Sequence, residues 1–298
     1  RFYGLTNQHE RIFSMELTQP KTIKEIAAKF GFSFSKGLGQ NFLLDKNVLE
    51  NIIDAAQPQN GVLEVGPGFG VLTRELAKNS EKVVSVELDK RLFPVLEYTL
   101  AEFDNVSLIE GDILKIDLKK VLSENFGDKK ISFAANLPYY ITTPIITMLL
   151  EGHFPVKKIV VMVQKEVAKR LCADAGSKDY GAISLLCRYY TNPRIVTIVP
   201  AQSFYPAPKV DSAVICLDVC EKPNADVEDE KMFFRIIKAA FSQRRKTLLN
   251  CLSSALNMPK DEVSVHIKNC GIDPGVRGEK LGLAEYAALS DEFSKLFR

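Results

Sequence analysis

Histidine is scarce in this chain, and its cysteines form no metal-binding pattern. Of its 298 residues only three are histidines, His9, His153 and His266, and none stands beside a plausible nucleophile. The six cysteines are scattered along the sequence without a single C-x-x-C pair. Such cysteines are typical of small buried side chains in a reducing cytoplasm, and not of disulfides or metal ligands. We therefore expect a cytoplasmic protein with no metal and no Ser-His-Asp triad.

Long apolar segments are also missing. The sequence has no apolar run of about 18 residues, the length that a membrane-spanning helix needs. Residues 1–14 have no clear periodicity and no apolar h-region, so we expect a disordered extension, added or upstream, and not a signal peptide. The hydrophobic fraction of 46% is ample for a full core. A length of 298 residues then predicts one large soluble domain or two smaller ones.

The charges are unevenly distributed, although the net charge is only +2. Residues 221–230, "EKPNADVEDE", contain five acids and one lysine. The next twenty residues, "KMFFRIIKAAFSQRRKTLLN", contain six bases and no acid. A basic segment that follows an acidic one is the first indication of a polyanionic partner.

Strand-length and helix-length segments alternate from about residue 46 onward. The short segments rich in Val, Ile and Leu are 61–66, 82–88, 106–112, 130–136 and 158–164. The helical ones between them are 46–56, 70–79, 90–103, 118–126 and 143–152. This alternation predicts an α/β fold: a doubly wound, mostly parallel sheet that is covered on both faces and reaches to about residue 200.

The pattern changes in the last third of the chain. Residues 194–200 and 212–219 read as two further strands, and the acidic stretch 221–230 reads as a linker. Beyond it all the periodic segments are helical. We therefore predict one domain over residues 15–220 and a smaller all-α domain over residues 221–298.

Four predicted strands end in residues suited to ligand binding, and ligands bind at the carboxyl ends of the strands in such sheets. The first ends in "EVGPGFG", where Gly66, Gly68 and Gly70 allow a tight turn and close approach to the backbone. A purely structural turn is the alternative. Glu87 lies 21 residues after Gly66, where an acid accepts from ribose hydroxyls. A helix N-terminal acid is the alternative, and it fits Asp89 better.

The third and fourth strand ends complete the pattern. Asp112 follows the third strand, where its carboxylate could accept from an adenine amino group or cap the next helix. The fourth ends in "NLPY", which begins at Asn136. Together these features describe a nucleoside pocket. Because no P-loop lysine or second glycine loop is present for phosphates, S-adenosylmethionine is favoured over NAD or ATP.

The strings "GLGQNFL", "EVGPGFG", "NLPYYITTP", "FYPAPKVDSAV" and "AAFSQRRKTL" occur in this order and resemble the ribosomal RNA adenine N6-dimethyltransferases. The resemblance runs from about Lys36 to the C-terminus. It implies the Rossmann-like methyltransferase fold and a methyl donor, S-adenosylmethionine, bound without metal. The donor would contact residues matching the family motifs: Asn41, Leu43, Gly66, Gly68, Glu87, Asp112 and Asn136.

The "NLPY" motif explains how adenine N6, a weak nucleophile, could react. The Asn136 side-chain oxygen and the Leu137 carbonyl would accept from its hydrogens, and Pro138 would lock the turn. Tyr139 would stack on the base, and Phe204 is the candidate for its other face. Core packing is the alternative for Phe204, and we expect Tyr140 to be structural.

A basic C-terminal surface would hold the RNA. Arg235 and Lys238 lie on a predicted helix, and Arg244, Arg245 and Lys246 are consecutive in "QRRK". A solvated basic face is the alternative, but the resemblance places this segment near RNA and favours phosphate contacts.

The resemblance implies two adjacent adenosines in a hairpin loop near the 3′ end of small-subunit rRNA as substrate. The partner would be the assembling small ribosomal subunit, and the enzyme would act as a monomer in ribosome biogenesis, away from membranes. Three alternatives remain open: a resistance-type enzyme that modifies large-subunit rRNA, a non-catalytic assembly factor with the same fold, and a nicotinamide oxidoreductase.

Overall fold

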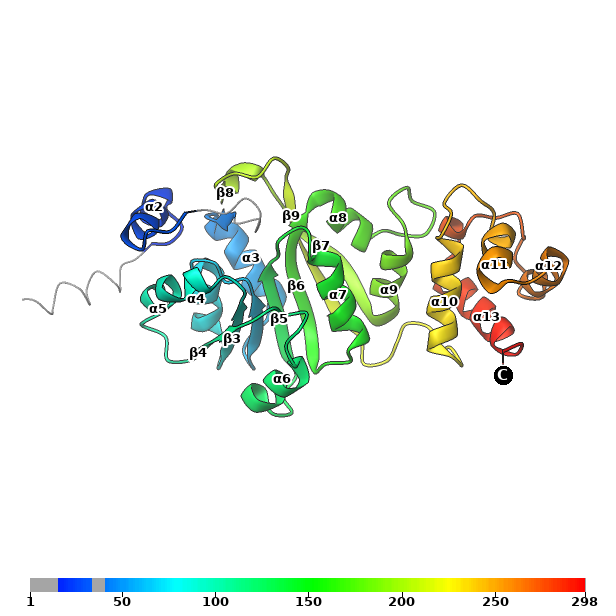
Figure 1. The fold of residues 1–298 in the computed structure, drawn as a ribbon, viewed down its shortest axis with the longest axis horizontal. Coiled ribbons are helices and arrows are strands. Elements are labelled where there is room, and N and C mark those ends of the chain that lie inside the picture. Colours follow the sequence, from blue (N-terminus) through cyan, green and yellow to red (C-terminus); the bar gives the residue numbers. More distant parts are fainter. Residues whose placement is uncertain (1–15, 34–40, 298) are drawn as a thin grey trace, which may run out of the picture. The chain divides into compact units, whose positions relative to one another are not determined.

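A computed structural model describes residues 16–33 and 41–297 (Figure 1). The expected disorder of residues 1–14 lies outside this range. The chain divides into two compact units. The first runs to Ala168 and includes Arg194–Val219, and the second consists of Lys169–Pro193 and Cys220–Arg298. A functional boundary at residue 220 stays a prediction.

The first unit contains a seven-stranded sheet in the order β4-β3-β2-β5-β6-β9-β7. Strands β2, β3, β4, β5 and β6 pair in parallel with one another, and β9 is antiparallel to β6. A mostly parallel sheet, as the sequence predicts, is therefore confirmed. The strands are β2 Val62–Val65, β3 Val83–Glu87, β4 Val106–Glu110, β5 Ile131–Asn136, β6 Val156–Gln164, β7 Thr191–Val199 and β9 Ser212–Val219.

The central strands are buried on both faces. Every residue of β2 and β3 is buried, as in parallel sheets that are covered by helices on both sides. Because each helix returns the chain to the same end of the sheet, the carboxyl ends of β2, β3, β4 and β5 lie along one edge. The helices are α2 Pro20–Lys29, α3 Lys46–Ala56, α4 Val71–Asn79, η2 Lys90–Leu92, α5 Phe93–Thr99, α6 Leu118–Phe126 and α7 Thr142–Glu151.

Two of these helices begin at the acidic caps that their sequences contain. The Asp45 carboxylate accepts from the backbone N–H groups of Asn47 and Val48 at the start of α3. The Asp117 carboxylate accepts from Lys120 N at the start of α6. Such caps satisfy backbone donors that the first helical turn leaves without partners. Both helices therefore span the predicted residues.

Several elements have no counterpart in the sequence prediction. Helices α8 (Lys165–Leu171) and α9 (Ala182–Tyr190) occupy a stretch for which no element was expected. Two short strands, β1 (Phe42–Leu43) and β8 (Phe204–Tyr205), pair antiparallel beside the main sheet. The pairing of β1 with β8 brings Phe42 and Leu43 next to the proline-rich loop, although some 160 residues separate them.

The C-terminal helices of the second unit match the predicted helical segments. They are α10 Glu230–Ala240, α11 Leu248–Leu256, α12 Lys260–Asn269, η4 Gly278–Lys280 and α13 Leu283–Ser294. Helix α9 also belongs to this unit. The centroid of its Tyr189 ring lies 4.8 Å from that of the Phe233 ring on α10. Among the described residues, no helix has the length and apolar character needed to cross a bilayer.

Candidate active site

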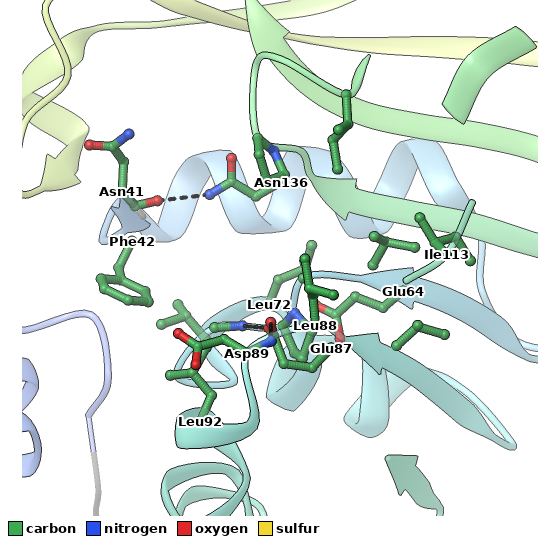
Figure 2. A pocket seen from close by; sticks show the side chains of 18 of the residues that line it. Asn41, Phe42, Glu64, Leu72, Glu87, Leu88, Asp89, Leu92, Ile113 and Asn136 are labelled. Atoms are coloured by element: carbon green, nitrogen blue, oxygen red, sulfur yellow. Dashed lines mark hydrogen bonds between the residues drawn. The ribbon is translucent and has the colours of Figure 1, made fainter. Parts of the chain in front are cut away.

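A pocket opens along the sheet edge where β2, β3, β4 and β5 end (Figure 2). It collects residues from the glycine loop, from all three following strand ends and from the N-terminal segment. The predicted donor-binding residues Asn41, Leu43, Gly66, Gly68, Glu87, Asp112 and Asn136 all line it. The structure therefore brings together the complete predicted set, which comes from segments up to 95 residues apart.

The glycine loop lets a ligand approach the backbone. Gly66 has a φ of +69°, and a Cβ placed on it would meet no atom within 4 Å. Gly68 has a φ of +60°, and its Cβ would lie 2.7 Å from the Phe42 ring. Only glycine combines these backbone angles with such close packing. The loop leads into the N-terminus of α4, where free backbone N–H groups and the helix dipole favour negatively charged groups.

Glu87 closes the end of β3. Its side chain is 6% exposed, and it accepts from Gly68 N at 3.4 Å and from Asp89 N at 2.8 Å. Burial raises the pKa of the Glu87 carboxyl, while these backbone donors act to lower it. The adjacent acid, Asp89, caps η2 and holds Arg91 through two hydrogen bonds. Both acids line the pocket, and of the two it is Asp89 that caps a helix, as the alternative from the sequence had it.

Glu64, an acid that the sequence analysis did not single out, lies in the pocket wall on β2. It is 1% exposed, and its Oε2 accepts from Thr73 Oγ1 at 2.7 Å and from Ser85 Oγ at 2.6 Å. Burial raises the pKa of Glu64 to about 7 from its ordinary value of 4.5. A carboxyl group beside the glycine loop can thus change its charge near neutral pH.

Asp112 lies at the end of β4, and its side chain serves a local turn. Its Oδ1 accepts from Leu114 N at 3.1 Å, and its Oδ2 lies 3.2 Å from Lys115 Nζ. The sequence alternative, a cap on the next helix, is wrong: Asp112 closes a local turn, and Asp117 caps α6. The residue also lines the pocket, so turn closure and ligand contact are compatible.

The segment that begins at Asn136 leaves β5 and turns sharply. Ile141 N donates to Pro138 O at 3.2 Å, which closes a turn over Tyr139 and Tyr140. Leu137 N still donates to Met162 O on β6, but no described group donates to the Leu137 carbonyl. Leu137 is 2% exposed and is not among the residues that line the pocket, so a contact between its carbonyl and a ligand stays a prediction.

The amide of Asn136 is held in one orientation. Its Nδ2 donates to Asn41 O at 2.9 Å, and Figure 2 shows the two residues facing each other at one side of the pocket. Within the described residues no group donates to Asn136 Oδ1. Fixing the nitrogen in this way leaves the oxygen as the free acceptor of the side chain.

The aromatic residues are arranged differently from the prediction. Tyr140, expected to be structural, is 58% exposed and lines the pocket. Tyr139 is half-buried and does not line it, and its hydroxyl lies 3.0 Å from Ser212 Oγ. Phe204 is 4% exposed and belongs to the hydrophobic core, which is the packing alternative that the sequence left open.

Several apolar residues that line the pocket were not singled out from the sequence, among them Leu88 and Ile113. Leu88 is 53% exposed although it is a large aliphatic residue, whereas Ile113 is buried in the wall. Together with Tyr140 they give the pocket an apolar side that suits a planar ring. The sequence did contain a signal that could have identified these two residues. Leu88 directly follows Glu87, and Ile113 directly follows Asp112, the two predicted ligand-binding acids.

The predicted RNA-binding residues lie in the second unit. All of Arg235, Lys238, Arg244, Arg245 and Lys246 are exposed. The last three form a loop between α10 and α11. Arg244 is partly engaged, since it donates to Lys178 O at 2.9 Å and lies 3.9 Å from Glu279. The Arg235 guanidinium lies over the Phe297 ring, 5.0 Å from its centroid.

No cluster of three or more His, Cys, Asp or Glu side chains could hold a metal ion within residues 16–33 and 41–297. The arrangement at the sheet edge is thus built from a glycine loop, carboxylates and an amide.

Comparison with known proteins gives a consistent result. The family described as "Ribosomal RNA adenine dimethylase" matches residues 31–295. A ribosomal RNA small subunit methyltransferase A of Alkaliphilus oremlandii is 47% identical over 282 residues, which cover 94% of this chain and 98% of the relative. The protein of the same name from Bacillus cytotoxicus is 49% identical, with coverages of 93% and 97%. The crystal structure of a dimethyladenosine transferase from Plasmodium falciparum, 26% identical, has a TM-score of 0.73 and covers 85% of this chain and 98% of its own.

Proposed function

Since this chain belongs to the ribosomal RNA adenine dimethylase family, we propose that it is an S-adenosylmethionine-dependent dimethyltransferase of small-subunit rRNA. It transfers methyl groups to the N6 atoms of two adjacent adenosines in a hairpin loop near the 3′ end, during ribosome biogenesis. Near-complete coverage of relatives at 47% and 49% identity supports the small-subunit substrate over the large-subunit one.

One observation supports the chemistry most directly: the fixed amide of Asn136 at the mouth of the pocket. With its Nδ2 bound to the Asn41 carbonyl, its Oδ1 is an oriented acceptor. The Leu137 carbonyl next to it is a second acceptor without a backbone donor. Two acceptors side by side suit an exocyclic amine, which carries two hydrogens.

The pocket fits the methyl donor. The space above Gly66 allows a ligand to reach the backbone, and the Glu87 carboxyl can accept from ribose hydroxyls. Asp112 can accept from an adenine amino group, with Leu88 and Ile113 against the ring. S-adenosylmethionine supplies a methyl group that its positive sulfur has already activated. The residues of this chain therefore need only bind and orient the two reactants.

The target nitrogen needs help because its lone pair is delocalised into the adenine ring. Hydrogen bonds from N6 to Asn136 Oδ1 and to the Leu137 carbonyl would favour the pyramidal form, in which the lone pair is available. This is electrostatic preorganisation, and it requires no strong general base. Pro138 restricts the turn so that the Leu137 carbonyl stays out of the strand ladder.

The adenine must leave its stack to enter the site, and Tyr139 is proposed as its stacking face. Phe204 is proposed for the opposite face, a role that requires its ring to leave its packed position when RNA binds. The basic residues of the second unit would contact phosphates of the assembling subunit. We further propose that the enzyme acts as a cytoplasmic monomer.

Mass spectrometry of ribosomal RNA provides the test. Small subunits that lack the modification are incubated with the enzyme and S-adenosylmethionine, and the 16S-type RNA is digested and analysed. We expect N6,N6-dimethyladenosine at two neighbouring positions of one 3′-terminal fragment. Large-subunit RNA is the control, and methylation of that RNA alone would overturn the proposed substrate.

A further inference from the structure

Tyr139, the proposed stacking residue, is held at the far end of its ring. Its hydroxyl lies 3.0 Å from Ser212 Oγ, within hydrogen-bond distance. A tyrosine side chain rotates about two bonds, and a hydrogen bond at the para position restricts the first, which sets where the ring points; the hydroxyl oxygen lies on the axis of the second. The contact therefore fixes the position of the hydroxyl and with it the direction in which the ring extends from the backbone.

Ser212 provides a rigid point of attachment. It is fully buried, is the first residue of β9, and pairs in antiparallel register with Gln164, the last residue of β6. A buried hydroxyl that loses its partner is costly, so this pairing is strongly favoured over alternatives. Gln164 lies two residues beyond Met162, which pairs with Asn136. Ser212 is thus part of the same sheet as β5, the strand that leads into the turn over Tyr139 and Tyr140.

The preceding residue, Asp211, fixes the backbone at this point. Its carbonyl accepts from Lys165 N at 3.1 Å at the start of α8, and its Oδ2 lies 3.6 Å from Lys165 Nζ. Its Oδ1 accepts from Ala201 N at 3.2 Å, at the start of the short helix η3 (Ala201–Ser203) that leads directly to Phe204. Asp211 therefore connects Ser212, which contacts Tyr139, to the segment that leads to Phe204.

We propose that Ser212 is a positioning residue for methyl transfer: it holds the Tyr139 ring in the place where the ring can stack on the target adenine. This inference rests on the proposed function, since it assigns Ser212 to the base-binding side of the same site. Ser212 does not touch the donor pocket, and neither does Tyr139. Its effect is therefore confined to the RNA substrate and acts through Tyr139.

The role matters most for a reaction that occurs twice on one nitrogen. After the first transfer N6 retains a single hydrogen, so one of the two acceptors loses its partner. Orientation then depends more heavily on the stacking face. A loosely held ring would therefore slow the second transfer more than the first, and the monomethylated product would accumulate.

A double-mutant cycle tests the proposal, with full-length Ser212→Ala, Tyr139→Phe and the double variant. Tyr139→Phe keeps the stacking face and removes only the hydroxyl. For each single variant we expect kcat/KM for unmodified small subunits to fall roughly tenfold, the factor that corresponds to a net hydrogen bond of about 1.4 kcal/mol. The double variant should fall by the same factor, because both changes remove one contact.

Two further measurements separate positioning from a merely structural role. Calorimetric affinity for S-adenosylmethionine should stay within twofold of wild type in all three variants, and the ratio of monomethylated to dimethylated adenosine should rise. Ser132→Ala is the matched control, since Ser132 is also a fully buried strand serine and donates to Ala56 O at 2.6 Å. It should lower the melting temperature without changing the product ratio.

The outcomes are distinct. Losses that multiply to about a hundredfold in the double variant, or an unchanged product ratio, would overturn the role of Ser212. Loss of donor affinity in Ser212→Ala would also overturn it, because the effect would then be a general one. If the wild-type enzyme does not methylate small subunits, the proposed function itself fails, and this result is seen before any variant is compared.

Discussion

A single hydrogen bond gives Asn136 its direction. An amide can present either its oxygen or its nitrogen to a substrate, and the two have opposite hydrogen-bonding character. Here the Asn41 carbonyl accepts from Nδ2, so Oδ1 is the group left for a substrate amine. This backbone contact comes from a segment 95 residues earlier in the chain, which explains why the motif alone could not reveal it.

We expect Asn136→Ala to abolish most methyl transfer while RNA binding persists. Removal of a preorganised polar group from an active site typically slows the reaction by about 10²–10³-fold. RNA affinity depends largely on phosphate contacts, which this change does not touch. Single-turnover methyl transfer and RNA binding by fluorescence anisotropy measure the two effects. Asn125→Ala on α6 is the control, and unchanged turnover in Asn136→Ala would refute the assigned role.

We expect the ionisation of Glu64 to make the stability of the folded protein depend on pH. Its folded-state pKa is about 7, compared with an ordinary value of 4.5, because burial disfavours the charge. Below pH 4.5 both folded and unfolded forms are protonated, so the group has no effect. Between pH 4.5 and about 7 the Glu64 carboxyl ionises in the unfolded chain but not yet in the folded one, so the free energy of unfolding falls as the pH rises. Above the folded pKa it no longer changes through this group.

Glu64→Gln should therefore become more stable relative to wild type as the pH rises from 4.5 to about 7, and the difference should be constant above that. At 1.36 kcal/mol per pKa unit the gain would be roughly 3 kcal/mol. Hydrogen bonds altered by the amide add an offset that does not depend on pH. Melting temperatures across this range provide the measurement, and parallel curves for the two proteins would contradict the prediction.

At the scale of elements, the strand ends were predictable and the loops between distant segments were not. Topology alone places Gly66, Glu87, Asp112 and Asn136 at one edge, because each follows a parallel strand that ends there. The environment of Phe204 depends instead on the pairing of β8 with β1, a contact between segments some 160 residues apart. Its burial therefore could not be read from the proline-rich loop itself.

Helix α9 was missed for a local reason. It begins after Gly181, whose backbone N–H donates to the Ser184 hydroxyl, and no side chain caps its first turn. Sequence signals of helix starts are mostly polar side chains at the N-cap, and glycine gives a weaker one. The helices that do have acidic caps, α3 and α6, were predicted to the residue.

The loop between α10 and α11 allows a prediction about RNA affinity. Arg245 and Lys246 make no ion pair or side-chain hydrogen bond within the described residues, whereas Arg244 is engaged with Lys178 and Glu279. We expect Arg245→Ala with Lys246→Ala to weaken RNA binding and to lower the slope of log affinity against log salt by about 1.4–1.8, at 0.7–0.9 per phosphate contact.

The matched control for this loop removes the same charge elsewhere. Lys119→Ala with Lys120→Ala on α6 also removes two exposed positive charges, but from the other compact unit. RNA affinity measured at several salt concentrations should change little in this control. Equal losses in the two double variants would mean that net charge, and not this loop, determines RNA binding.

At the scale of the whole molecule, the two compact units are interleaved along the chain. The segment Lys169–Pro193 belongs to the second unit, although residues on both sides of it belong to the first. Its helix α9 packs aromatic rings against α10, with Tyr190 and Phe234 stacked at 5.9 Å. Sequence composition indicated a boundary at the acidic stretch 221–230 but could not show that an earlier segment joins the later helices.

Removal of residues 220–298 should therefore damage what remains of the chain. The truncated protein would keep Tyr189 and Tyr190 but lose Phe233 and Phe234, which pack against them. Large aromatic rings exposed together favour association, so we expect aggregation and a lower melting temperature than for the full chain. Replacement of both tyrosines by serine in the truncated chain should reduce the aggregation, as measured by light scattering. A truncated protein that is monomeric and melts cooperatively at the full-length temperature would show that α9 does not depend on the C-terminal helices.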